Sequence, residues 1–305
     1  MAVEAISVPV IDLSNFPAER DKLVWASTEL GCFRVVNHGI PPAMLAEMKA
    51  VVRALFEIPA EVKQRNADII AGSGYMAPSL QNPLYEAFGL YDAASSADVR
   101  AFCNLLEASS YHKEIFSLYF TKLHVLIVDI ASKVAESLGL VGYSFDDWPC
   151  QARINRYNFT EETIGSSGVQ IHTDSGFLTI LQEDGSVGGL EMMDSSGNFQ
   201  AVDAVPGTFI VNLGDVAKIW SNGRLHNVKH RVQCKVAHPR ISIALFMLAP
   251  KDGKVEPQAK FIDSEHPCLY QTIIYNEYRK LRLSSSERAT GALHLLAVNQ
   301  TATKA

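Results

Sequence analysis

The alternation of apolar and polar residues along the chain changes near residue 150. Before that point apolar residues recur mainly at helical spacing, and the pattern predicts helices over residues 17–30, from Pro41 to about Phe56, and across residues 94–140. Two short strands are predicted among these helices, at residues 7–13 and 32–36. The apolar residues of the third helical region lie on one stripe, which indicates packing against a core: Phe116, Tyr119, Phe120, Leu123, Leu126, Ile127, Ile130, Val134 and Leu138.

After residue 150 the pattern becomes a series of short β-type runs separated by Gly, Asp, Asn and Pro. It predicts eight strands, at residues 153–159, 169–172, 179–182, 189–193, 199–202, 208–213, 227–233 and 240–248. Strands of this length and spacing favour a jelly roll or barrel over βαβ units. Residues 270–296 are again helical in pattern. We therefore expect a mainly β fold with flanking α-helices, divided into a mostly helical region at 1–150 and a jelly-roll core with C-terminal helices at 151–305.

Composition narrows the classes of function. The chain has 305 residues, 48% of them hydrophobic and 20% charged, with a net charge of -6, so nucleic acid is not expected as a partner. No run of about eighteen apolar residues predicts a membrane span, and the first residues lack the basic region of a secretory signal. The five cysteines are widely spaced without a CxxC pair, which indicates reduced thiols and a cytoplasmic protein.

His172, Thr173 and Asp174 are the first candidate for chemistry. Residues two apart on a strand share a face, so the imidazole and the carboxylate can reach one cation. A second histidine from a neighbouring strand would complete a set of two histidines and one carboxylate, which suits Fe(II) with open coordination positions. His226 and His230 both qualify, since they would share a strand face, and the residues alone leave this choice open.

Arg240 and Ser242 form another pair two residues apart, at the start of an apolar strand. A guanidinium beside a hydroxyl is suited to holding a carboxylate.

Together these motifs resemble the plant 2-oxoglutarate/Fe(II)-dependent dioxygenases. His172-x-Asp174, His230 followed by Arg-Val, and Arg240-x-Ser242 stand in the order of that family's signature. The resemblance extends to VPVIDL at 8–13, GCFRVVNHGI at 31–40, FEIP at 56–59 and RINRY at 153–157.

The resemblance implies a distorted double-stranded β-helix wrapped by N- and C-terminal helices, and it selects His230 over His226. Fe(II) would be bound by His172, Asp174 and His230. The cosubstrate 2-oxoglutarate would be held by Arg240, Ser242 and Tyr157, with Asn155 beside it. O2 would be the oxidant, ascorbate a reductant of the iron, and succinate and CO2 the coproducts.

HTDSGFLTIL at 172–181 and GGLE at 188–191 are most similar to the auxin-oxidising branch of this family and its glucosinolate-modifying relatives, and the overall match is closest to the auxin-oxidising branch. That branch implies oxidation of indole-3-acetic acid, or of its amino-acid conjugate, to the 2-oxindole form. For such a substrate we expect Arg153 as the carboxylate partner and an apolar slot formed from Phe159, Phe177 and Phe246. The alternatives are a gibberellin oxidase or another small-molecule hydroxylase of the family, a zinc hydrolase, and a non-catalytic jelly-roll binding module.

Overall fold

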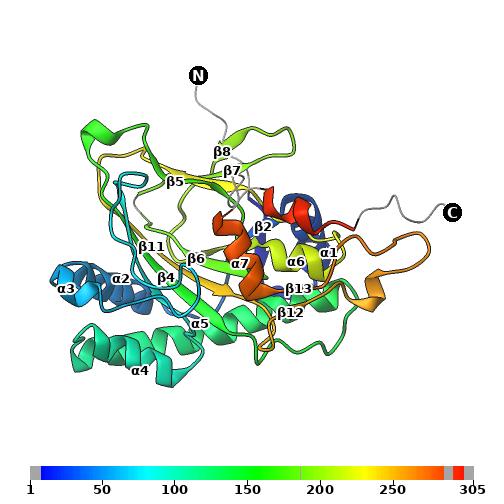
Figure 1. Ribbon diagram of the computed structural model, residues 1–305, viewed down its shortest axis with the longest axis horizontal. Coiled ribbons are helices and arrows are strands. Elements are labelled where there is room, and N and C mark those ends of the chain that lie inside the picture. Colours follow the sequence, from blue (N-terminus) through cyan, green and yellow to red (C-terminus); the bar gives the residue numbers. More distant parts are fainter. Residues whose placement is uncertain (1–7, 186, 285–290, 299–305) are drawn as a thin grey trace.

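Two antiparallel sheets form the centre of the protein, and Figure 1 shows the strands of the smaller sheet across from those of the larger one. The computed structural model describes residues 8–185, 187–284 and 291–298. The larger sheet has seven strands, in the order β1 (Val10–Asp12), β2 (Cys32–Val36), β9 (Phe209–Leu213), β6 (Leu178–Gln182), β11 (Arg240–Met247), β4 (Cys150–Tyr157) and β3 (Tyr85–Leu90). The smaller sheet has four, in the order β5 (Ser167–His172), β10 (His230–Gln233), β7 (Leu190–Met193) and β8 (Phe199–Ala201).

The two sheets confirm the predicted double-stranded β-helix. All eight strands expected after residue 150 are present with small shifts at their ends, and adjacent strands are antiparallel except for β1 and β2. The expected strand at 7–13 is observed as β1, although residue 7 lies outside the described residues.

The region before residue 150 contributes strands as well as helices. Strand β2 pairs with β9 and strand β3 pairs with β4, so this region extends the larger sheet at both edges. Strand β3 was not predicted, because its six residues follow a stretch rich in Gly, Pro and Ser and its strand form depends on pairing with β4. The helices here are α1 (Arg20–Trp25), α2 (Pro42–Phe56), α3 (Ala60–Lys63), α4 (Ser96–Leu105) and α5 (Ser110–Ser137), with a 3-10 turn at Leu13–Asn15 and a π-helical turn at Ala26–Leu30.

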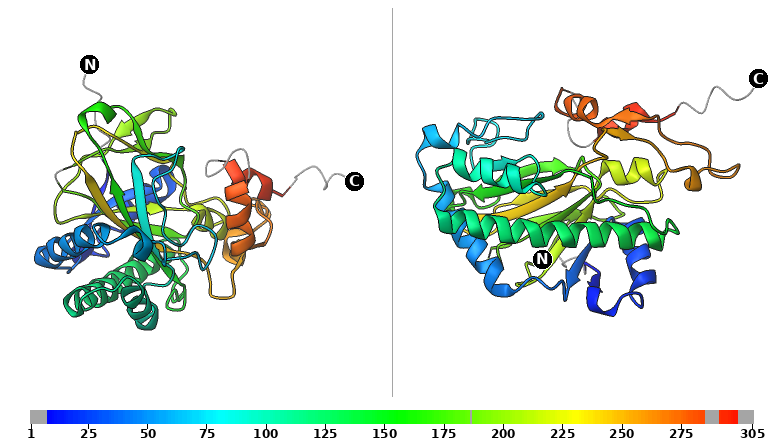
Figure 2. Two further views of the ribbon diagram at one scale, coloured as in Figure 1. Left: turned by 60° about the vertical axis from the view of Figure 1, so that its left-hand side comes forward. Right: turned by 90° about the horizontal axis from the view of Figure 1, so that it is seen from below.

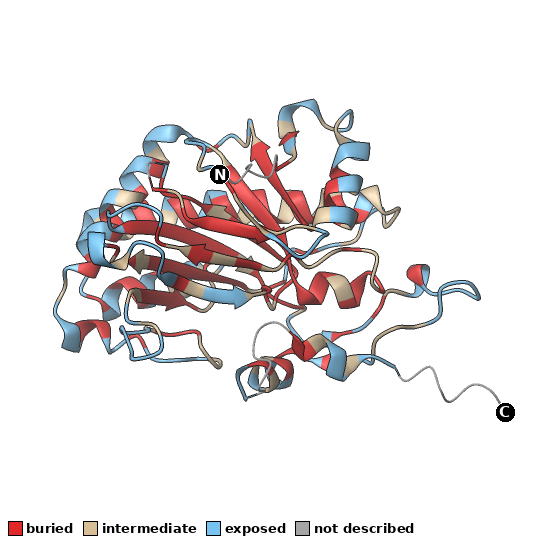
Figure 3. Cartoon of the chain, turned by 90° about the horizontal axis from the view of Figure 1, so that it is seen from above, coloured by how far each residue is buried: buried red, intermediate tan, exposed pale blue. Residues whose placement is uncertain are grey.

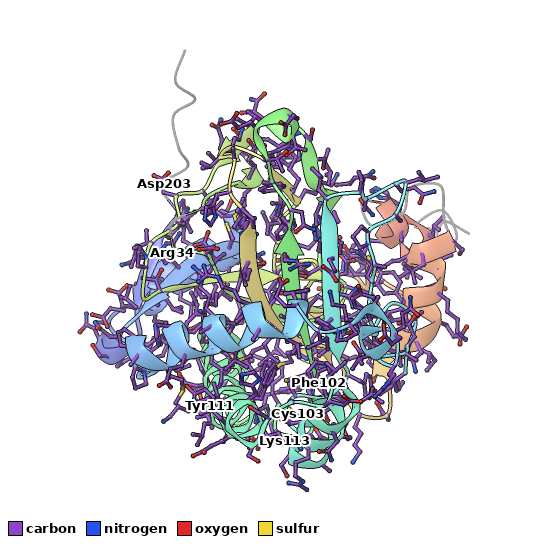
Figure 4. All side chains as sticks on the ribbon, turned by 90° about the vertical axis from the view of Figure 1, so that its left-hand side faces the viewer. Arg34, Phe102, Cys103, Tyr111, Lys113 and Asp203 are labelled. Carbon is purple, nitrogen blue, oxygen red and sulfur yellow. The ribbon has the colours of Figure 1, made fainter. Side chains whose placement is uncertain are left out.

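Helix α5 runs along the larger sheet, as the right-hand view of Figure 2 shows. It begins after Ser109, whose Oγ accepts a hydrogen bond from the backbone N–H of His112. The predicted apolar stripe from Phe116 to Val134 is buried in the core, which confirms that prediction. Among the described residues α5 is the one helix long and apolar enough to cross a membrane, and half of that stretch is buried inside the protein. Figure 4 shows α4, with Phe102 and Cys103, beside α5.

A buried arginine ties β2 to the core. Arg34 donates to Oε2 of Glu183 at 3.0 Å, to the Thr208 hydroxyl at 2.6 Å and to the Asp203 carbonyl oxygen at 2.6 Å. Arg34 and Asp203 are labelled at this place in Figure 4. Since Glu183 directly follows β6 and Thr208 directly precedes β9, these bonds connect three neighbouring strands of the larger sheet.

The second half of the chain adds short helices around the ends of the strands. They are α6 (Asp215–Trp220), α7 (Tyr275–Ser284) and the 3-10 turns Glu161–Thr163, Ala259–Phe261 and Ala292–Leu296, and strands β12 (Lys254–Val255) and β13 (Ile273–Ile274) form a small ribbon. Helix α6 falls between two predicted strands and was missed, because one and a half turns give too short a pattern to detect. The predicted helical region at 270–296 is seen as α7 and the last 3-10 turn, while residues 285–290 lie outside the described part. Figure 3 shows that the strands are mostly buried and that exposed residues lie mainly on the surrounding helices and loops.

Candidate active site

The side chains of His172, Asp174 and His230 converge at one end of the smaller sheet. His172 ends β5 and His230 begins β10, and the two residues are direct partners across the antiparallel pair. Oδ1 of Asp174 lies 3.8 Å from Nε2 of His172 and 3.7 Å from Nε2 of His230. The donor atoms of the three side chains all lie within 4.8 Å of one another, which is the spacing of ligands around one metal ion.

Neighbouring groups orient each of these donor atoms. Nδ1 of His172 lies 2.8 Å from the Gln170 carbonyl oxygen, so it carries the proton and leaves Nε2 as the free donor atom. Nδ1 of His230 faces the Val228 carbonyl oxygen at 3.3 Å in the same way. The second carboxylate oxygen of Asp174 accepts a hydrogen bond from Thr179 Oγ1 at 2.6 Å. One lone pair of each of the three ligands therefore points to the same place.

The protonation state also fits a metal. Burial, and then the nearby His230, lowers the pKa of His172 to about 4, so its imidazole is neutral near pH 7. A neutral imidazole is the form that binds a metal ion. Two histidines and one carboxylate that meet with other positions open are the ligand set of non-haem Fe(II) oxygenases.

A cavity of about 100 Å³ extends from the metal ligands between the two sheets. Its inner wall is formed by β11 and β4, on which Arg240 pairs with Tyr157 and Ser242 pairs with Asn155. Asn155 donates to the Ser242 hydroxyl at 3.2 Å and accepts from the Tyr85 hydroxyl at 2.7 Å. Burial raises the pKa of Tyr157 to about 12, so its hydroxyl stays protonated and can donate.

Arg240 is the most deeply buried charged residue on the wall of this cavity. It is 1% exposed, and its Nε and Nη1 have no hydrogen-bond partner among the described residues. Its guanidinium lies 5.0 Å from the centre of the Tyr157 ring. A buried guanidinium with free donors is costly unless an anion binds it, so the residues present fit the distal carboxylate of 2-oxoglutarate.

Of the four residues expected to bind the organic substrate, two line this cavity and two do not. Arg153 and Phe246 lie on its wall, on the same strand faces as Asn155 and Ser242.

The other two aromatic residues, Phe159 and Phe177, are not among the residues that line this cavity. Phe177 is fully buried in an aromatic cluster with Phe145, Trp148 and Trp220. Phe159 packs against Tyr157 and Cys234 behind the cavity wall. Both lie beyond the end of a regular strand, where side-chain alternation no longer predicts direction.

His226 lies apart from the metal ligands. It precedes β10, in the loop after α6, and lines a different cavity. The alternation that left His226 and His230 equivalent in sequence does not apply, because the strand begins only at His230.

A cluster of buried polar side chains contacts the backbone of the metal-binding segment, residues 172–174. Arg282 of α7 donates to the Thr173 carbonyl oxygen at 2.6 Å and forms an ion pair with Asp215. The backbone N–H of Asp215 donates to the Asp174 carbonyl oxygen at 2.8 Å. Asn227 and Tyr278 each donate to the Asp215 carboxylate at 2.7 Å. The bond from Asn227 connects Asp215 to the loop before His230. No local pattern in the sequence indicated the part played by Arg282.

Comparison with known proteins agrees with this site. The model of the 2OG-Fe(II) oxygenase superfamily matches residues 149–249, and the N-terminal model of non-haem dioxygenases in morphine synthesis matches residues 8–109. The 2-oxoglutarate-dependent dioxygenase DAO of Oryza sativa subsp. indica is 57% identical over 298 residues, which are 96% of this chain and 99% of the relative. The chain therefore belongs to the 2-oxoglutarate/Fe(II)-dependent dioxygenases, and it is an enzyme that uses Fe(II) and 2-oxoglutarate.

Solved structures and a more distant relative place the chain within this family. A crystal structure of the dioxygenase for auxin oxidation in rice has a TM-score of 0.89 and 57% identity, and the match covers 95% of this chain and 100% of that one. The dioxygenase for auxin oxidation 1 from Arabidopsis thaliana, in a complex with 2-oxoglutarate, has a TM-score of 0.82 and 55% identity over 85% of this chain and 99% of that one. Gibberellin 3-beta-dioxygenase 4 of Arabidopsis thaliana is 30% identical over 95% of this chain and 86% of its own.

Single substitutions test whether His230 or His226 is the third metal ligand. We expect His172→Ala, Asp174→Ala and His230→Ala each to abolish turnover, because each removes one of three protein ligands. His226→Ala serves as the control and keeps most activity. Anaerobic Fe(II) binding and 2-oxoglutarate turnover measure both effects; full iron occupancy in His230→Ala together with its loss in His226→Ala would reverse the assignment.

The Arg282 contact is expected to act on the metal through Thr173. Arg282→Met removes the bond to the backbone between His172 and Asp174, and we expect Fe(II) affinity to fall by about 10- to 100-fold, as for other groups that orient metal ligands. Arg282→Lys, which keeps the charge, should recover part of the loss. Lys280→Met is a control on the exposed side of α7. Unchanged Fe(II) affinity in folded Arg282→Met would remove Arg282 from this role.

Proposed function

We propose that this enzyme oxidises indole-3-acetic acid, or its amino-acid conjugate, to the 2-oxindole form and thereby inactivates auxin. Its similarity to the rice and Arabidopsis dioxygenases for auxin oxidation supports the substrate class. The observation that carries the proposal within the site is Arg153, a buried cation on the cavity wall.

Arg153 is suited to the carboxylate of such a substrate. It is 8% exposed, and among the described residues no carboxylate lies within ion-pair distance of it. Nη1 donates to the Gly74 carbonyl oxygen at 2.5 Å, which fixes the guanidinium while its other N–H groups remain for a ligand.

The volume of the cavity indicates which of the two ligands its enclosed part can hold. About 100 Å³ is well below the roughly 300–1,000 Å³ of sites for drug-sized ligands. The enclosed part therefore fits 2-oxoglutarate, with its distal carboxylate at Arg240, Ser242 and Tyr157 and with Asn155 beside it. The indole acid then lies along the part of the wall where Phe246 offers an aromatic surface and Arg153 a positive charge.

Each group of the chain has a definite task in this reaction. The bound Fe(II) and 2-oxoglutarate supply the oxidising power with O2, and ascorbate keeps the metal reduced. Arg240 and the Tyr157 hydroxyl hold the distal carboxylate, so the other end of the cosubstrate faces the three metal ligands. Arg153 fixes the substrate carboxylate and thereby directs the indole ring to the metal. The apolar strands around the cavity exclude water.

We also propose that residues 1–150 and 151–305 act as one catalytic unit in the cytoplasm. Tyr85 and Gly74 from the first region contact Asn155 and Arg153 of the second. The five cysteines are all free, and four are buried, which agrees with a reducing compartment.

Product analysis tests the function directly. The enzyme with Fe(II), 2-oxoglutarate, ascorbate and O2 is given indole-3-acetic acid, its aspartate conjugate or a gibberellin, and products are identified by mass spectrometry. We expect one oxygen added to the indole ring, with succinate formed in equal amount. Oxidation of the gibberellin alone would favour the gibberellin oxidase, and no oxidation of any acid would contradict the proposal.

The first variant isolates the cosubstrate contact. Arg240→Ala is expected to raise the apparent KM for 2-oxoglutarate by about 10- to 150-fold, because a charge-assisted bond to a carboxylate contributes roughly 1.5–3 kcal/mol. The KM for the organic substrate should change far less. Arg240→Lys keeps the charge without the planar guanidinium, so its KM for 2-oxoglutarate should lie between those of the parent and Arg240→Ala. An unchanged KM for 2-oxoglutarate in Arg240→Ala would exclude this contact.

The second variant isolates the substrate contact. Arg153→Leu is expected to weaken indole-3-acetic acid binding while 2-oxoglutarate binding is unchanged, since Arg153 and Arg240 hold different ligands. Titration of each ligand into the anaerobic Fe(II) protein measures both affinities. If indole-3-acetic acid binds Arg153→Leu as tightly as the parent, Arg153 is not its carboxylate partner.

A further inference from the structure

A second and larger cavity lies on the reverse side of the metal-binding segment. It has a volume of about 590 Å³, within the usual range for small-molecule sites. Thr173, which lies between the ligands His172 and Asp174, is on its wall together with Arg282 of α7. None of the residues that line this cavity lines the active-site cavity.

Three basic side chains gather on the wall of this second cavity. They are Lys218 of α6, His226 in the following loop and Lys229 directly before β10, and all three are half-buried. Within the described part of the chain, none of their side chains has an ion pair or a hydrogen bond. These groups are therefore available to a ligand.

The acidic residues of the cavity form no ion pair with these three basic side chains among the described residues. Asp215 is paired with Arg282. Asp194 accepts bonds from Ser196, Asn198 and Gln200 in its own turn. Glu29, at the rim, is exposed to solvent. The carboxylates of Asp215 and Asp194 are thus already bound within the chain, whereas among the described residues Lys218 and Lys229 have no carboxylate within ion-pair distance.

The basic groups also disfavour one another's charge. Burial is the largest cause and lowers the pKa of Lys218; Asp215 raises it, and Lys229, the smallest of the three causes, lowers it. Burial lowers the pKa of His226, and the next largest cause is Lys218. An anion between these groups would remove that repulsion.

Part of the remaining wall is apolar. Leu30, Met193 and Leu293 contribute to it from three separate elements of the chain. We propose that this cavity is a binding site for a small organic anion, with its acidic group at Lys218, His226 and Lys229 and its apolar part along Leu30, Met193 and Leu293. This site is separate from the one that binds the substrate in the proposed function and does not depend on it.

The test uses 4-phenylbutyrate as the probe and 4-phenylbutanol as its uncharged counterpart. Both are titrated calorimetrically into the anaerobic enzyme loaded with Fe(II) and 2-oxoglutarate. We expect saturable binding of the acid and binding of the alcohol that is at least about tenfold weaker, because charge-assisted contacts are lost.

Variants locate the bound probe. Lys218→Met/Lys229→Met should weaken 4-phenylbutyrate binding by about 10- to 100-fold while 2-oxoglutarate turnover and thermal unfolding stay as in the parent. Lys122→Met/Lys251→Met removes two exposed lysines elsewhere and should leave binding unchanged. Equal affinity for the parent and Lys218→Met/Lys229→Met, or no saturable binding to the parent, would overturn the proposal.

Arg153→Leu separates the two cavities. If the probe occupies the second cavity, this variant binds it as the parent does. Loss of probe binding in Arg153→Leu but not in Lys218→Met/Lys229→Met would place the probe in the active site and overturn the second site, while leaving the proposed function intact.

Discussion

The antiparallel pairing of β5 with β10 is the constraint on which the site depends. It sets His172 opposite His230, with ring centres 4.2 Å apart, before any metal is considered. Strand β10 is also paired with β7 on its other side, so His230 is held from both directions. A shift of one residue in this register would turn one imidazole to the opposite face of the sheet and destroy the ligand set. The backbone ladder therefore fixes two of the three ligands.

Asp174 lies outside that ladder, and close backbone contacts hold it instead. Gly214 allows the turn before α6 to approach this segment: a Cβ there would lie 2.3 Å from the Gly176 carbonyl oxygen and 2.7 Å from that of Asp174. The N–H of Asp215 can then donate to Asp174, while its carboxylate binds α7 and the loop before β10. The third ligand is thus positioned by elements that come later in the chain.

These two kinds of constraint explain what the sequence could predict. Strand periodicity and motif order were sufficient to single out His172 with Asp174 and Arg240 with Ser242. The two members of each pair stand two positions apart on or next to a strand, so they share a face. The same rule failed for Phe177, since an aromatic cluster in the core, and not a strand face, determines its direction. Arg282 lies 67 residues from Asp215, and no local pattern marks such a contact. Strand β3 likewise exists through its pairing with β4.

The buried cations of the active site couple the fold to its ligands. Arg240 has donors without partners within the described residues, and Arg153 has a single carbonyl partner, so the folded chain without ligands bears the desolvation cost of both charges. An anion that binds the folded form but not the unfolded chain stabilises it, by about 2.7 kcal/mol when the ligand is at 100 times its Kd. Arg240 is 1% exposed and Arg153 is 8% exposed, and both lie on the wall of the same cavity, on the neighbouring strands β11 and β4. If Arg240 holds 2-oxoglutarate and Arg153 holds the substrate carboxylate, as proposed, each ligand relieves the desolvation cost of one of these cations and so adds to the stability of the folded enzyme.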